Sequence, residues 1–80
     1  MKLVKLLDYV LCDVLIVVES VSGNPGNLVF SSWELFNGYI LDVPEWLYSY
    51  RVVAFLAVED VIKIYLVPDD VLLSELKKFL

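Results

Sequence analysis

The chain has 80 residues, of which 60% are hydrophobic, and its net charge is −5 at pH 7. This length corresponds to one domain, and an acidic chain lacks the clustered Lys and Arg that direct binding to nucleic acid requires. Histidine, the commonest general base and metal ligand, is absent, and the single cysteine, Cys12, excludes an intrachain disulfide.

The apolar content exceeds what so small a domain readily buries, which predicts self-association. The longest unbroken apolar run, Val52–Val58, is far shorter than the ~18 residues that span a bilayer. Asp8 and Asp13 interrupt the apolar N-terminal segment, and no small-residue cleavage site follows, so a signal peptide is not expected. The sequence therefore predicts a cytoplasmic protein that has no membrane partner.

The first predicted element is a helix at about residues 2–11, because its apolar residues recur at the spacing of one helical face. The run at residues 14–18, which is β-branched apart from Leu15, then predicts a central strand, covered on both faces in its first half. Residues 22–27, SGNPGN, are the clearest loop in the chain.

The middle of the chain predicts two strands and a short helix. The segment LVFSSWELF is a predicted strand, and Asn37-Gly38 is a hairpin signal that leads to a short third strand, YILDV. Asp42 and Glu45 have the spacing of a capping box, with Pro44 in the first turn. They predict a helix of about two turns, VPEWLYSY, that has Asp42 as its cap.

Two strands and a helix complete the chain. RVVAFLAV and VIKIYLV are expected to form a hairpin joined at Glu59-Asp60, with Ile62 and Ile64 almost fully buried. Asp69 or Asp70 then caps a C-terminal helix, whose acidic start and basic end suit the helix dipole.

The predicted fold class is α+β. Adjacent strands joined by short connections should pair antiparallel, which gives a small antiparallel sheet of four to five strands. The N-terminal helix, the short middle helix and the C-terminal helix should cover one face of this sheet or its ends.

Motifs spread over about residues 1–67 resemble those of a known group of proteins. The matching residues are Leu3, Leu6 and Leu7, then Gly38-Tyr39, then Asp42-Val43-Pro44-Glu45 with Leu47, then Val52, and finally Val61–Leu66. The group consists of small uncharacterised accessory proteins from phages and prophages of Firmicutes. It brings no catalytic residues, and the terminal helix and the SGNPGN loop depart from its usual form. What the resemblance implies is context, because accessory phage proteins of this size often act by binding a host protein.

The candidate binding residues are aromatic, because residues 38–50, GYILDVPEWLYSY, could form a stacking platform or an anchor for a partner. Helix geometry favours Trp46 and Leu47 on the inner face of the short helix, closing the core. Tyr48 points the other way, so contact with a partner and packing are equally open for it. The candidate partner-binding residues are Trp33, Tyr39, Trp46, Tyr48 and Tyr50.

The C-terminal helix is the predicted oligomer interface. Its apolar residues spread over more than one narrow stripe, so the helix should not bury them all against its own sheet. A homodimer or larger assembly is expected, and the candidate interface residues are Leu72, Leu73, Leu76 and Phe79.

The remaining motifs have ordinary structural explanations. The SGNPGN loop lacks the P-loop spacing, and turn and cap roles explain the acidic pairs Glu59-Asp60 and Asp69-Asp70. The serines have no histidine to activate them. We therefore expect no catalytic residue, no metal and no cofactor.

The leading functional hypothesis is a small non-enzymatic accessory protein that binds a host protein stoichiometrically, such as a phage or prophage inhibitor of a host defence system. One alternative is a small-nucleotide sponge that stacks a base at a subunit interface. Such a site needs basic groups near the aromatics, and only Arg51 is close in sequence. Another alternative is a structural virion or assembly subunit.

Overall fold

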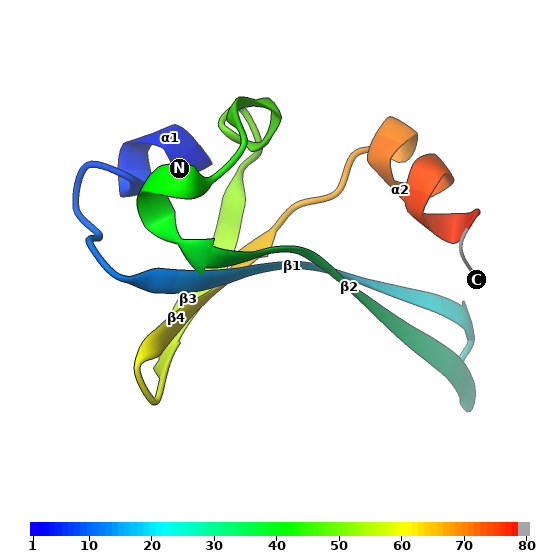
Figure 1. Ribbon diagram of the computed structural model, residues 1–80. Helices are drawn as coiled ribbons and strands as arrows, with labels where there is room; N and C mark the ends of the chain where they lie inside the picture. The colour runs from blue at the N-terminus through cyan, green and yellow to red at the C-terminus, as the bar shows by residue number, and fades with distance from the viewer. Residues whose placement is uncertain (79–80) are drawn as a thin grey trace.

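A four-stranded sheet forms the body of the protein in the computed structural model, which describes residues 1–78 (Figure 1). The strands are β1 (Asp13–Asn24), β2 (Asn27–Tyr39), β3 (Val52–Val58) and β4 (Val61–Leu66). Their order across the sheet is β2-β1-β4-β3, so β2 and β3 are its two edges. The predicted α+β class is confirmed.

The central pair of strands corrects the expectation of an antiparallel sheet. β1 pairs antiparallel with β2, and β3 with β4, as expected for neighbours joined by short turns. β1 and β4 run parallel, however, with Ile16 opposite Ile64. Between β1 and β4 the chain forms β2, β3 and the segment that joins them. β1 and β4 are therefore not linked by a short connection that would fix their relative direction. The sheet is therefore mixed.

Short helices lie over one face of this sheet (Figure 1). They are α1 (Leu3–Leu6), the 3-10 turns η1 (Ile40–Asp42) and η2 (Glu45–Leu47), and α2 (Asp70–Lys77). α1 is shorter than the predicted helix at residues 2–11. Tertiary contacts hold it, because the backbone N–H groups of Leu3 and Val4 donate to the carbonyls of Tyr50 and Tyr48, at 2.8 and 3.2 Å.

The middle segment differs most from the prediction. Asn37 and Gly38 form no hairpin turn, because they pair with Leu15 and Val14 and so extend β2 to Tyr39. Residues 40–42 form a 3-10 turn where a strand was predicted, and the predicted two-turn helix is the single turn η2. Long-range pairing with β1 here outweighs the local turn preference.

Asp42 is not a helix cap, which corrects the capping-box prediction. Its side chain is exposed, and Pro44 occupies the position before η2 without a capping hydrogen bond. Val43, directly after Asp42, and Leu47, at the end of η2, are buried, and these two side chains hold the segment against the core instead. The cap predicted for the last helix is confirmed, because Oδ1 of Asp69 accepts a hydrogen bond from the Leu72 backbone N–H at 2.7 Å.

The core lies between the helices and the sheet face that they cover. Its largest fully buried side chains are Leu3, Val14, Ile16, Val18, Ile40, Leu47 and Ile64. The expectation of a buried Ile64 is thus confirmed, whereas Ile62 is only part-buried. Ile62 lies closer to the β3–β4 turn, toward the end of the hairpin that projects past the helices (Figure 1).

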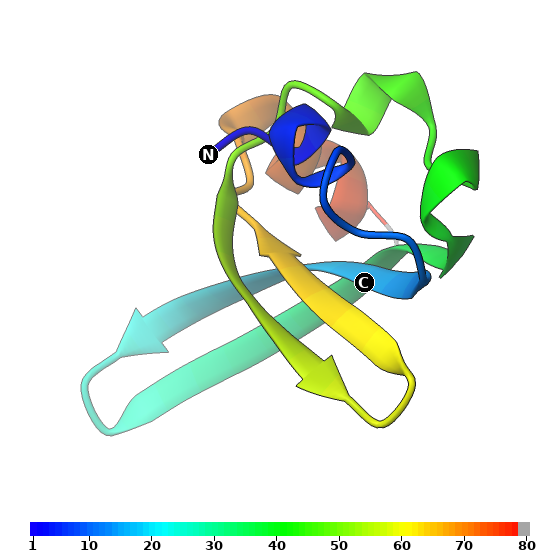
Figure 2. The same cartoon turned by 90° about the vertical axis from the view of Figure 1, so that its left-hand side faces the viewer.

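Both hairpins project beyond the helical layer, and they cross at a marked angle (Figure 2). Residues 21–30, at the far end of the β1–β2 hairpin, are all exposed. The radius of gyration is 13.4 Å, against about 12 Å for a compact chain of this length. The projecting hairpins account for this excess, and they leave much of the sheet without cover.

Candidate functional site

In the described part of the chain, residues 1–78, one face of the sheet carries no helix, and the residues of this face follow from the strand register. Lys63 of β4 lies between Leu15 of β1 and Leu56 of β3, and Tyr65 lies between Val17 and Ala54 in the same way. Because neighbours in register point to the same side, these side chains lie opposite the buried Ile64. We call the following part of this face the open face: Leu15, Val17, Ala54, Leu56, Val58, Val61, Lys63 and Tyr65. Asn37 and Glu34 of β2 pair with Leu15 and Val17 and give this face a polar border on the β2 side.

The centre of the open face is packed although no helix covers it. Val17 is only 4% exposed, because it lies on a central strand between longer side chains of its neighbours. Leu56 and Val58, on the edge strand, are each 46% exposed. The open face therefore has little exposed surface at Val17 and more exposed apolar surface toward β3.

Lys63 is the cation at the centre of the open face. Its Nζ lies 5.0 Å from the ring centre of Tyr65, within cation–π range. The pKa of Lys63 is raised, chiefly by hydrogen bonding with the Tyr65 side chain and also by the negative charge of Glu19, although desolvation opposes this. The Lys63 ammonium thus lies beside the Tyr65 ring.

Two shallow grooves flank this Lys63–Tyr65 pair. The first, of about 380 Å³, is lined by Glu19, Val53, Ala54, Tyr65, Leu66, Val67 and Pro68. The second, of about 340 Å³, is lined by Leu15, Asn37, Val58, Glu59, Val61 and Lys63. The first lining is mainly apolar with Glu19 as its carboxylate, which suits apolar side chains of a partner, whereas Asn37, Glu59 and Lys63 make up half of the second lining, which suits a mixed polar and apolar surface.

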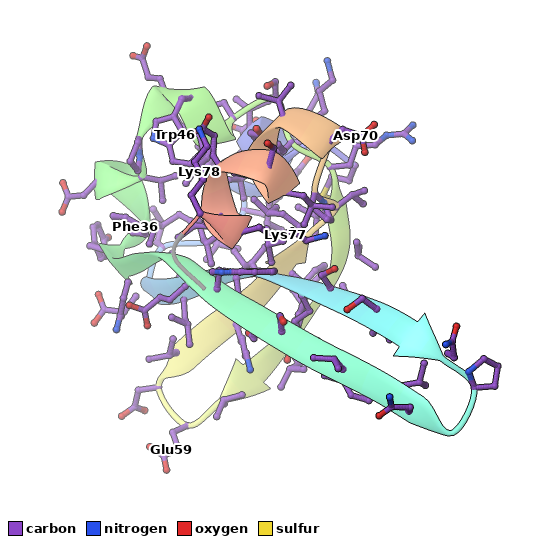
Figure 3. All side chains as sticks on the ribbon, turned by 90° about the vertical axis from the view of Figure 1, so that its right-hand side faces the viewer. Phe36, Trp46, Glu59, Asp70, Lys77 and Lys78 are labelled. Carbon is purple, nitrogen blue, oxygen red and sulfur yellow. The ribbon has the colours of Figure 1, made fainter. Side chains whose placement is uncertain are left out.

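The predicted aromatic residues lie on the other side of the molecule or at its margin. Trp33, Tyr48 and Tyr50 are part-buried against the core, and Tyr39 is 40% exposed at the end of β2. Trp46 is 54% exposed, so the expectation that it closes the core is wrong, whereas Leu47 is fully buried as expected. Figure 3 shows Trp46 on the helical side, far from Glu59 at the β3–β4 turn.

Trp46 and Tyr50 are brought into contact, edge to face, with ring centres 6.2 Å apart and ring planes at 87°. Burial raises the pKa of the Tyr50 phenol, and so do the charge of Asp69 and a hydrogen bond to it. Asp69 also caps α2. Tyr50 packs against the core, and with Asp69 nearby its role is a structural one.

The predicted oligomer interface on α2 uses its leucines internally. Leu72 is buried in the core, and Leu73 and Leu76 are part-buried against it. Val71 is exposed, and Phe79 lies outside the described residues. The described part of α2 thus leaves less free apolar surface than its sequence suggested.

Sequence reasoning predicted β3 as a strand but missed its exposure and its position at the edge of the sheet. Residues 53–58 are all exposed, and they form an unbroken apolar run at the border of the sheet. The signal was the unbroken apolar run Val52–Val58, which was predicted as a strand and judged too short to span a membrane but was not considered as an exposed surface. A run of this composition is also typical of a strand, and the register with β4 places it at an edge.

Comparison with known proteins gives no match to a family model, to a curated protein or to a solved structure. Within residues 1–78, no helix is long and apolar enough to cross a membrane. The same residues contain no group of three or more acidic or cysteine side chains that could hold a metal ion. The open face, with its two grooves on either side of Lys63 and Tyr65, is the candidate functional surface among the described residues.

Proposed function

We propose that the chain is a small protein-binding module and that the open face is its binding surface. In the context implied by the phage and prophage resemblance, the partner is a host protein, and the module inhibits a host defence system by stoichiometric binding. The observation that carries the proposal is the open face itself, an apolar sheet surface without helical cover.

The composition of the open face supports protein binding. Exposed apolar surface rimmed by polar groups is typical of interfaces, and here Glu19 and Glu59 stand at the margins of the two grooves. Tyr65 is an aromatic anchor of the type that dominates binding energy in such surfaces. Lys63 supplies a fixed positive charge beside it, which favours a partner that presents a carboxylate next to apolar side chains.

Photo-crosslinking in the native cell tests this proposal. A photoreactive phenylalanine replaces Tyr65 on the open face, and the matched control replaces Tyr9, which is 83% exposed near α1. We expect one discrete adduct with a second protein from position 65, absent from position 9, and lost when Lys63→Glu is added. Equal adducts from both positions, or none from position 65, would contradict the proposal.

A nucleotide-binding role is the second candidate, and one observation favours it. Trp46 is half exposed, its ring meets Tyr50, and Arg51 follows directly in the chain. Stacking of a base would quench Trp46 fluorescence. Titration of purine nucleotides into the protein and into Trp46→Leu, which retains Trp33, separates the candidates: quenching that depends on Trp46 favours the nucleotide site, and its absence favours the open face.

A further inference from the structure

The edge of the sheet at β3 has an irregularity of register between Val52 and Ala54 at its start, but residues 54–58 beyond it lack the other features that normally prevent strand pairing. Natural edge strands carry charges, Pro, a β-bulge or a covering segment, because their free N–H and C=O groups otherwise pair with another strand. Residues 53–58 contain neither a charge nor Pro, and Val53 and Phe55 are 64% and 51% exposed. This strand is apolar on both faces.

Among residues 1–78, the N-terminal segment covers the beginning of this edge. The Val52 backbone N–H donates to the Met1 carbonyl at 2.7 Å, and Lys2 pairs with Arg51 as an isolated antiparallel bridge. Figure 2 shows the N-terminal residues at the start of β3, with the rest of the strand running free to the β3–β4 turn. The free length, residues 53–58, is about 20 Å at the usual strand rise.

The charges at the two ends of this free length are opposite. Lys2 and Arg51 stand at its beginning, and Glu59 and Asp60 stand at its end. If two copies of β3 pair antiparallel, the basic end of each lies beside the acidic end of the other. In a parallel pair, like charges would lie side by side and repel.

We propose that β3 pairs antiparallel with β3 of a second copy across a two-fold axis, which doubles the four strands of the sheet to eight. In this arrangement the strand is complementary to its own copy, because its middle is uncharged and the basic end of each copy attracts the acidic end of the other. An edge of this length gives a small interface, so the dissociation constant is expected to be on the order of micromolar. The interface differs from the one predicted on α2, and the dimer does not depend on the proposed function.

The other edge does not offer the same site. β2 carries Glu34 in its middle, together with Ser and Asn residues along its length. Antiparallel pairing of β2 with itself around this region would bring two carboxylates close together. β2 is therefore protected against pairing with another strand, and it serves as a control for β3.

Sedimentation velocity of the full chain at a series of concentrations is the first test. We expect a monomer–dimer equilibrium that Phe55→Lys weakens by about tenfold, since a Lys in the middle of an edge strand blocks pairing. The matched control, Phe30→Lys, removes a phenylalanine that is 73% exposed on the β2 edge and should leave the equilibrium unchanged. A wild-type chain that is monomeric throughout, or an equal effect of both variants, overturns the proposal.

A charge exchange tests the antiparallel arrangement and does not depend on Phe55→Lys folding. Arg51→Glu and Glu59→Arg should each weaken the homodimer by about three- to tenfold, because like charges then meet at both ends. A mixture of the two variants should restore association, since the acid introduced at position 51 meets the base introduced at position 59. Failure of the mixture to associate more strongly than either variant alone rejects the antiparallel pair.

Discussion

The two hairpins of the sheet differ in their edges and in their support. The β1–β2 hairpin is long, its far half is exposed, and its edge strand β2 is interrupted by Glu34 and by Ser and Asn residues. The β3–β4 hairpin is short, Ile64 anchors it in the core, and its edge strand β3 is uniformly apolar. A polar edge can project into solvent safely, whereas an apolar edge invites a partner. We infer that the β1–β2 hairpin projects into solvent and that the β3–β4 hairpin forms the contact with another molecule.

The largest expected effect concerns how firmly each hairpin is held. Ile64→Ala should lower the free energy of unfolding by about 2–5 kcal/mol, because it removes buried methyl groups and leaves a cavity in the core. Val21→Ala, in the exposed half of the β1–β2 hairpin, should cost less than about 1 kcal/mol. Urea denaturation measures both values. Similar losses from the two variants would show that the hairpins are held equally.

The next effect concerns two acids that the sequence presented as helix caps. Asp69→Ala should cost about 0.5–2 kcal/mol, because it removes the acceptor for the Leu72 N–H at the start of α2, whereas Asp69→Asn should be tolerated. Asp42→Ala should have almost no effect, because Asp42 is exposed and caps nothing. Thermal unfolding of the three variants checks this order. A large loss of stability in Asp42→Ala would mean that the Asp42 carboxylate does stabilise the fold.

The two hairpin turns should respond in opposite directions. Gly26 in the β1–β2 turn has φ 88°, so Gly26→Ala should cost about 1 kcal/mol. Glu59 in the β3–β4 turn has φ 57°, a conformation that Asn adopts more easily, so Glu59→Asn should stabilise the protein by about 0.5–1 kcal/mol. Chemical denaturation gives both signs. A destabilising Glu59→Asn would mean that the carboxylate contributes more than its backbone strain removes.

The smallest effect is a dependence on alkaline pH at the base of the β3–β4 hairpin. The folded-state pKa of Tyr50 is raised above its ordinary value of 10.0, so the folded state holds this proton more tightly than the unfolded state. The resulting stabilisation is fully present below pH 10 and is lost as the pH rises through the folded-state pKa. Tyr50→Phe should therefore flatten the decline in stability above pH 10, and Tyr9→Phe should not. An unchanged decline in Tyr50→Phe would exclude the Tyr50–Asp69 contact as its cause.

Features that depend on neighbouring residues could be predicted from the sequence. Pro25 and Gly26 turn the chain within the SGNPGN segment, although β1 and β2 extend further into it than expected. Asp69 caps α2, and the alternation of β4 correctly buries Ile64. In each case the interaction that decides the structure lies within a few residues of the signal.

Features that depend on distant strands could not be predicted. Asn37-Gly38 has the local signature of a turn, but its pairing with β1 keeps it in a strand. The parallel pairing of β1 with β4, and with it the position of β3 at an edge, has no local signal. Trp46 was assigned to the core from the periodicity of a helix that does not form, so its exposure could not be foreseen. The open face and the free edge follow from topology, which is why the sequence pointed to the aromatic segment instead.

Amide hydrogen exchange followed residue by residue at low and high protein concentration tests the difference between the two edges most directly. If β3 pairs with a second copy, the outward-facing amides of residues 53–58 become more protected as the concentration rises, while those of β2 do not change. Protection that is independent of concentration at β3, or that rises equally at β2, would contradict the account.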